Sequence, residues 1–136
     1  MITALDSSVL LDVFGADPVY GVRSQQAMRS AIAQGRLVAC EAVWAEVAGF
    51  FASPADARAA MERLGVDFSA ITLETVLEAS KAWKTYRQQG GKRTRVAADF
   101  LIGAHALSQA DRLLTRDRGF YRSYFKRLSV LDPTQS

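Results

Sequence analysis

Residues 2–6 of this chain read ITALD, a short and mostly apolar run that ends in the carboxylate of Asp6. No charge interrupts the run, which predicts a strand that is covered on both faces and lies centrally in a parallel sheet. In open α/β sheets, functional sites form beyond the carboxyl ends of the strands. Asp6 is therefore a candidate ligand, although an aspartate there could equally cap the helix that follows.

Three more carboxylates stand at comparable places. Glu46 and Asp99 lie in helical stretches that are otherwise apolar or small, and Asp117 follows the run RLLT at residues 112–115, which reads as another buried strand. Four carboxylates gathered at one edge of a sheet repel one another unless a divalent cation neutralises them. The pattern predicts a hard-metal site, and such sites serve phosphodiester chemistry.

Each of these acids also has a simpler structural interpretation. Asp99 fits an acid favoured by the dipole in the first turn of a helix, and Asp117 fits a turn former after a strand. Glu46 has small and apolar neighbours at helical spacing. A charge on such an apolar stripe is costly unless it is paired or metal-bound, so the ligand interpretation is favoured there.

The remaining pattern indicates one α/β domain over residues 1–136. Strands alternating with helices predict βαβ units, a parallel sheet with helices on both faces, and an accessory helical hairpin at residues 41–65. Ser7 or Ser8, Asp17, Ser53 and Thr72 are the expected helix caps. Strands are expected at 2–5, 37–40, 66–71, 112–115 and 128–131, and helices at 7–14, 17–34, 41–51, 53–65, 72–89 and 96–109.

The amino-acid composition limits the cellular compartments and the partners that fit this chain. The single cysteine, Cys40, cannot form an internal disulfide and is expected to be a core thiol in a reducing cytoplasm. No signal peptide and no membrane span are expected. The net charge of +3 is uneven, because residues 81–127 hold twelve Lys or Arg against three Asp. Such a block could contact a polyanion, or it could be an ordinary solvated surface.

The sequence lacks the local motifs that several other enzyme classes require. A phosphoaspartate hydrolase needs Asp-x-Asp after its first strand, but Asp6 is followed by two serines. The paired acids of a receiver domain and a phosphate-binding glycine-rich loop are also missing from the sequence. A serine hydrolase is disfavoured because the only histidine, His105, accompanies no nucleophile elbow. His105 is expected to be a packed helix residue.

Four stretches taken in order resemble a PIN domain: LDSSVLLD at 5–12, the helix with Glu46, ADFLIGAHAL at 98–107 and LTRDRGFY at 114–121. Within that family the chain most resembles the VapC type of ribonuclease toxin from prokaryotic toxin–antitoxin pairs. The resemblance covers the whole chain. It implies a three-layer α/β/α sandwich on a central parallel sheet and Mg²⁺- or Mn²⁺-dependent cleavage of RNA.

The resemblance also implies roles for particular residues. The acidic ligands would be Asp6, Glu46, Asp99 and Asp117, with the Ser8 and Thr115 hydroxyls supporting them. Carboxylates can hold one or two hydrated Mg²⁺ ions, so that an activated water attacks phosphorus and no histidine base is needed. This chemistry leaves a 5′-phosphate and a 3′-hydroxyl.

The expected partners are an RNA substrate, a cognate antitoxin and a second copy of the chain. A basic rim for RNA is expected from Lys92, Arg93 and Arg95 in the loop before Asp99, and from Arg116 and Arg118 around Asp117. For the antitoxin, a groove is expected on the 41–65 helical pair, although ordinary packing would explain its large apolar residues equally well. Those residues are Trp44, Phe50, Phe51 and Met61.

Two alternatives to a toxin stay open from the sequence. One is a PIN-type nuclease of RNA processing that has no antitoxin. The other is a noncatalytic module that binds RNA or protein and keeps only the fold. The intact acidic set argues against the second alternative.

Overall fold

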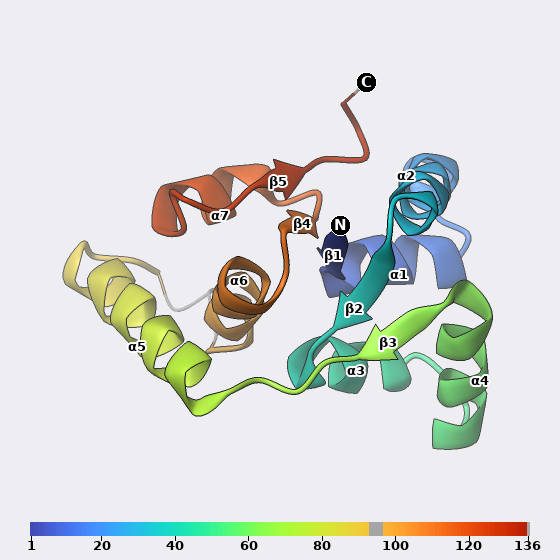
Figure 1. The fold of residues 1–136 in the computed structure, drawn as a ribbon, viewed down its shortest axis with the longest axis horizontal. Coiled ribbons are helices and arrows are strands. Elements are labelled where there is room, and N and C mark those ends of the chain that lie inside the picture. The colour runs from blue at the N-terminus through green and yellow to red at the C-terminus, as the bar shows by residue number, and fades with distance from the viewer. Residues whose placement is uncertain (93–96, 136) are drawn as a thin grey trace.

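The computed structural model describes residues 1–92 and 97–135, so Arg93 and Arg95 of the expected basic rim lie outside the described residues. Helices and strands alternate along the chain much as the sequence predicts (Figure 1). The elements are β1 (Ile2–Leu5), α1 (Ser7–Phe14), α2 (Gly21–Ala33), β2 (Arg36–Ala39), α3 (Glu41–Ala48), α4 (Pro54–Leu64), β3 (Val66–Phe68), α5 (Leu73–Gln88), α6 (Ala97–Gln109), β4 (Arg112–Leu114), α7 (Arg118–Tyr124) and β5 (Val130–Leu131).

The five strands form one parallel sheet in the order β3-β2-β1-β4-β5. The run at residues 2–5 is therefore the central strand, as predicted, and Leu5 is 1% exposed. The register pairs Leu5 with Leu114. The backbone N–H of Asp6 then donates to the Leu114 carbonyl at 3.0 Å, which fixes the ends of β1 and β4 side by side.

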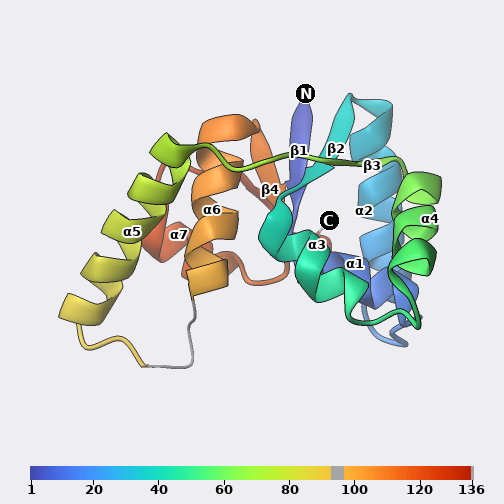
Figure 2. The ribbon, with the colours of Figure 1, turned by 90° about the horizontal axis from the view of Figure 1, so that it is seen from below.

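Helices cover both faces of the sheet. Figure 2 shows α5, α6 and α7 on one side of the strands and α1, α2 and α4 on the other. This is the expected three-layer sandwich. In the 41–65 segment, α3 contacts α4 but also packs against α1 and α6, and its Val43 and Val47 are buried in the core.

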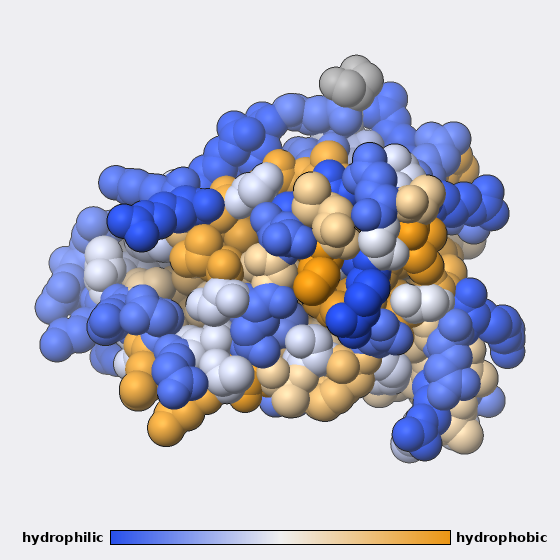
Figure 3. All heavy atoms as spheres, in the orientation of Figure 1, coloured by the Kyte–Doolittle hydropathy of each residue, from blue (hydrophilic) through white to orange (hydrophobic). Residues whose placement is uncertain are grey.

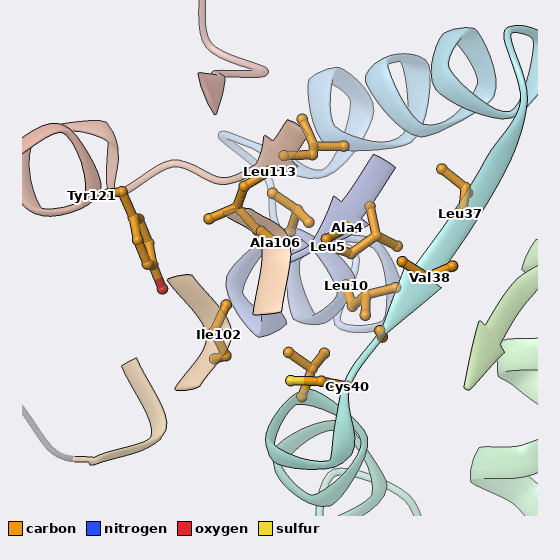
Figure 4. Packing of buried hydrophobic residues seen from close by; sticks show 14 of the residues in the cluster. Ala4, Leu5, Leu10, Leu37, Val38, Cys40, Ile102, Ala106, Leu113 and Tyr121 are labelled. Carbon is orange, nitrogen blue, oxygen red and sulfur yellow. The ribbon is translucent and has the colours of Figure 1, made fainter. Parts of the chain in front are cut away.

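The hydrophobic core lies where β1 and β4 meet α1, α3 and α6. Figure 4 shows side chains from these layers converging, among them Leu10, Ile102 and Leu113. Cys40 belongs to the same cluster and is 1% exposed, which confirms the core thiol. Burial raises the pKa of this thiol, so it stays protonated and unreactive. Within the described ranges, no helix is both long and apolar enough to cross a membrane.

Helix ends test the capping predictions. The Ser53 hydroxyl accepts the N–H of Asp56 at 3.1 Å, and the Thr72 hydroxyl accepts the N–H of Thr75 at 3.2 Å, so both predicted caps are confirmed. Neither Ser7 nor Ser8 caps α1. The N-cap position is Asp6, and its side chain makes no capping bond.

Two predictions about where a helix begins are wrong, and contacts within the fold explain both differences. Asp17 does accept the N–H groups of Val19 and Tyr20, at 2.9 and 2.8 Å, but it closes a turn and α2 begins only at Gly21. The segment after Asp117 was expected to be a turn, whereas α7 follows it directly. This short helix is held by the burial of Phe120 and Tyr121 against the sheet layer.

Candidate active site

Asp6 lies at the carboxyl end of the central strand and is only 7% exposed. The Thr115 hydroxyl donates to its Oδ2 at 2.7 Å, and the Ser7 hydroxyl lies 3.4 Å from its Oδ1. The Thr115 hydroxyl also accepts the backbone N–H of Asp117 at 3.0 Å. Thr115 therefore connects two of the four predicted acids through one oxygen atom.

The electrostatics show which other acids face Asp6. Burial is the main cause that raises the pKa of Asp6, and the negative charges of Asp99 and Asp117 raise it further. The hydrogen bonds from Thr115 and from the Ser7 backbone act in the opposite direction. The pKa of Glu46, whose side chain is exposed but partly desolvated, is also raised, first by this partial desolvation and then by the charges of Asp6 and Asp99. Asp6 therefore lies within electrostatic reach of Asp99, Asp117 and Glu46, and Glu46 also lies within reach of Asp99.

Four different elements supply these carboxylates. Asp6 ends β1, Glu46 lies on α3, Asp99 lies in the first turn of α6, and Asp117 is the N-cap residue of α7. They converge because the carboxyl ends of parallel strands meet at one edge of the sheet, and the helices that follow begin there. The predicted placement of the acids at one edge thus agrees with the fold.

The argument that placed Glu46 on a buried stripe is wrong. Val43 and Val47 on the same helix are buried, but Glu46 itself is exposed. The stripe of α3 that faces the core lies beside Glu46 and does not include it. Its closeness to Asp6 and Asp99 remains, and this closeness is what makes it a candidate ligand.

The two serines after Asp6 differ from the expectation. Sequence reasoning chose Ser8 as the supporting hydroxyl, yet Ser7 is the one near Asp6, and it also lowers the pKa of Glu46. The Ser8 hydroxyl is buried, and among residues 1–92 and 97–135 it has no hydrogen-bond partner, so it makes no bond to Asp6.

The donor set fits a hard divalent cation. All the converging groups are carboxylate or hydroxyl oxygens, which suit Mg²⁺ or Mn²⁺ rather than softer metals. Among residues 1–92 and 97–135, no three side chains of Asp, Glu, His or Cys are already gathered into a ready cluster of ligands.

Arg116, expected on the basic rim, is engaged in an ion pair. Its guanidinium donates to both carboxylate oxygens of Asp12, at 2.7 and 3.0 Å, and lies 4.0 Å from the centre of the Tyr20 ring. The Ser24 hydroxyl donates to the same carboxylate at 3.0 Å. Sequence reasoning missed this pair because its members are 104 positions apart.

Of the other described rim residues, Lys92 is exposed and Arg118 is half-buried. The backbone carbonyl of Lys92 accepts the Tyr86 hydroxyl. Arg118 donates to the side chain of Gln135. Lys92 and Arg118 can still bind a phosphate, whereas the guanidinium of Arg116 already donates to Asp12.

The large apolar residues of the 41–65 segment divide into two groups. Met61 is fully buried, and Phe51 packs edge-on against Phe14 with 5.0 Å between ring centres. Phe50 is 52% exposed, and Trp44 is half-buried with an indole N–H that finds no acceptor in the described part of the chain. A groove of about 660 Å³ adjoins this indole and is lined by Trp44, Pro54, Ala55, Arg58, Ala59, Glu62 and Phe68.

His105 is a packed helix residue, as expected. It is 1% exposed, and its Nε2 lies 2.9 Å from the Ser69 hydroxyl. Burial lowers its pKa, against a smaller opposing effect of Glu41. It is not among the groups whose charges act on Asp6 or Glu46.

Comparison with known proteins identifies the fold. The family model of the PIN domain matches residues 3–126. A chain of VapBC-1 from nontypeable Haemophilus influenzae is similar with a TM-score of 0.75 and 22% identity, covering 99% of this chain and 100% of that one. No curated protein sequence matches this chain.

Two further solved structures share the fold. A chain of VapBC2 from Rickettsia felis, bound to a DNA fragment from its promoter, has a TM-score of 0.71 and 14% identity, with 97% and 98% of the two chains covered. A chain of FitAcB from Neisseria gonorrhoeae has a TM-score of 0.70 and 18% identity, with 100% of both chains covered. At these identities the likeness concerns the fold.

Proposed function

This chain belongs to the PIN domain family, and we propose that it is a metal-dependent endoribonuclease toxin held in check by a cognate antitoxin. The observation that carries the proposal is the electrostatic coupling of Asp6 to Asp99 and Asp117, and of Glu46 to Asp6 and Asp99. A buried carboxylate surrounded by like charges is destabilising on its own, so the arrangement needs a cation to be favourable.

The proposed roles follow from the geometry of the described residues. Asp6, Glu46, Asp99 and Asp117 would hold Mg²⁺ or Mn²⁺, which when bound lowers the pKa of a water and offsets charge on phosphate oxygens. Thr115 orients Asp6 through its 2.7 Å hydrogen bond and favours the ionised carboxylate, against the larger effect of burial on its pKa. Ser7 does the same for the facing oxygen of Asp6 and for Glu46.

The Arg116–Asp12 pair gives Arg116 a positioning role in this proposal. Arg116 stands between Thr115 and Asp117, and its ion pair ties the corner between β4 and α7 to α1. The cations left for RNA phosphates are Lys92 and Arg118, together with Arg93 and Arg95 outside the described residues.

An antitoxin partner is supported by the neighbours, because one of the similar solved structures is described as a toxin–antitoxin complex from Klebsiella pneumoniae. In this chain, the groove beside Trp44 and the exposed Phe50 offers an apolar surface for such a partner. A homodimer contact is supported at a second place, where apolar side chains are exposed on α5 and α6. These are Leu73, Val76, Leu77 and Leu107.

Asp99→Asn tests the catalytic proposal. It removes one charge from the proposed metal site and keeps the shape, so RNA cleavage in Mg²⁺ should fall by orders of magnitude. Glu74→Gln is the matched control, because Glu74 is an exposed acid at the far end of α5. Product ends should carry 5′-phosphate, and calorimetry should show tighter Mg²⁺ binding to the control than to Asp99→Asn.

Three results would decide against the proposal or a part of it. If the Asp99→Asn variant cleaved RNA at the wild-type rate, the assignment of Asp99 to the catalytic site would be wrong. A wild-type protein that binds RNA yet neither binds Mg²⁺ nor cleaves would favour the noncatalytic module. A wild-type enzyme whose cleavage no co-expressed protein suppresses would favour a processing nuclease.

A further inference from the structure

A second groove, on the opposite side of the molecule from the apolar one, lies along α5. Its volume is about 640 Å³. The described residues that line it include two cations and an indole but no acid: Ser80, Trp83, Lys84, Arg87 and Gln88. Nothing in the catalytic proposal uses these side chains.

Trp83 is held rigidly at the base of this groove. Its ring stacks on Phe100 with 6.1 Å between centres and an angle of 19° between planes. Phe100 is 1% exposed and is fixed in turn by Tyr86 and Phe120, at 5.4 and 5.2 Å. Trp83 is half-buried, so one part of the indole is anchored in the core while the rest borders the groove.

The groove adjoins the proposed catalytic edge. Phe100 directly follows Asp99 in α6, so the ring on which Trp83 stacks belongs to the residue next to that acid. Figure 2 shows α5 alongside α6, with the end of α5 and the start of α6 at the same end of the helix pair. A strand of nucleic acid lying in the groove would therefore lead toward the acids.

The cations of the groove are available to a ligand. Lys84 and Arg87 are exposed, and within the part of the chain that the structure describes they form no ion pair. Lys81, one turn earlier, differs because it is paired with Glu78 at 3.0 Å. Figure 3 shows hydrophilic residues along the left edge of the molecule and an apolar patch below them.

From these contacts we propose that the α5 groove binds single-stranded RNA, with a base against Trp83 and phosphates at Lys84 and Arg87. The inference rests on the proposed function. An indole beside cations combines the two elements with which proteins hold unpaired strands, a stacking surface and a positive track for the backbone. A duplex is disfavoured because its bases are already stacked on one another. An acidic protein segment would satisfy the cations but would leave the indole without a stacking partner.

Binding of a labelled RNA oligonucleotide, measured by anisotropy in the Asp99→Asn background, tests the inference without cleavage. Trp83→Leu keeps the apolar packing but removes the aromatic face, and it should weaken binding by about 5- to 100-fold. Trp83→Phe should retain most of the affinity. Affinity for Mg²⁺ should not change in either variant.

The cations are tested by a second variant, because Trp83→Leu could also loosen the core. Lys84→Ala with Arg87→Ala alters only exposed side chains, and it should lower the salt slope of single-strand binding by roughly 0.7 per lost phosphate contact. Lys81→Ala is the matched control on the same helix and should leave the slope unchanged, since Lys81 is already paired.

Three results would overturn the inference: unchanged affinity in both groove variants, equal affinity for duplex RNA, or equal binding of poly-glutamate. These experiments distinguish a failure of the groove inference from a failure of the catalytic proposal. If the groove variants lose RNA affinity but the wild type does not cleave, the groove stands and the nuclease proposal fails. If the wild type cleaves and the groove variants cleave and bind equally well, the groove alone fails.

Discussion

Replacing Asp12 with alanine should destabilise this protein far more than an average substitution. Asp12 lies on α1 and is 4% exposed. It accepts two hydrogen bonds from Arg116 and one from the Ser24 hydroxyl, which is itself fully buried. Asp12→Ala leaves a guanidinium without its anion and a buried hydroxyl without its acceptor.

The size of the effect follows from these contacts. Removing one member of a buried ion pair costs about 3–5 kcal/mol. The side chain of Arg116 is 29% exposed, so water can partly replace Asp12 and the lower end applies. The orphaned Ser24 hydroxyl adds about 1 kcal/mol. We expect a loss of about 3–4 kcal/mol in the free energy of unfolding, or roughly 10 °C in Tm.

The two members of the pair should not be equivalent. Arg116→Met leaves the Asp12 carboxylate, 5% exposed, without a cation, so it should cost more than Asp12→Ala. The double variant Asp12→Ala with Arg116→Met leaves no unpaired charge at this corner, so it should be more stable than the sum of the single losses predicts.

Urea unfolding of the three variants without added metal measures all of these quantities. A cost below about 1 kcal/mol for Asp12→Ala, or additive losses in the double variant, would show that the pair does not hold α1 to the corner between β4 and α7. Asp56→Asn, a change at an exposed acid of α4, is a suitable control for charge removal alone.

Three further predictions can be checked with single variants. Burial lowers the pKa of His105 in the folded protein below its value in the unfolded chain. The unfolded chain therefore binds the proton of this imidazole more tightly. The free energy of unfolding should be full above a pH of about 6.5, the ordinary histidine value, and should decrease below it. His105→Gln should lessen that fall between pH 7.5 and 5.5, and an identical pH profile would contradict this. Thr115→Val removes the donor to Asp6 and should cost about 1.5–3 kcal/mol in urea unfolding, while Thr85→Val, at an exposed threonine of α5, should cost much less. Phe50→Asp, at a 52% exposed position, should weaken the complex with a co-expressed antitoxin without lowering Tm, and equal loss of both would return Phe50 to a purely structural role.

The features that the sequence predicts well are those with a local cause. An uncharged run such as residues 2–5 needs cover on both faces, and it does form the central strand. Ser53 and Thr72 cap their helices because a hydroxyl and the N–H three residues later lie in one turn. The placement of Asp6 and Asp117 at one edge of the sheet follows from parallel strand order, which the alternating elements already imply.

The features that the sequence did not predict depend on contacts between distant residues. The rotation of α3 about its axis decides whether Glu46 is buried, and that rotation is set by how Val43 and Val47 meet α1 and α6. The pairing of Arg116 with Asp12 joins α1 to the end of β4. The helix α7 has too few residues for an apolar period, and it forms because Phe120 and Tyr121 are buried by other elements.

Asp6 and Asp12 make an informative pair, because both are buried carboxylates at the two ends of the same short helix segment. Asp12 receives a guanidinium and a hydroxyl. Asp6 receives hydroxyl and backbone donors, but within the described ranges no cation contacts it, and its charged neighbours are Asp99 and Asp117. Packing alone would favour neutralising both carboxylates in the same way. The fold neutralises Asp12 and leaves Asp6 beside the like charges of Asp99 and Asp117. A cation from solution would therefore gain most at Asp6, which is the physical reason for proposing a metal site there.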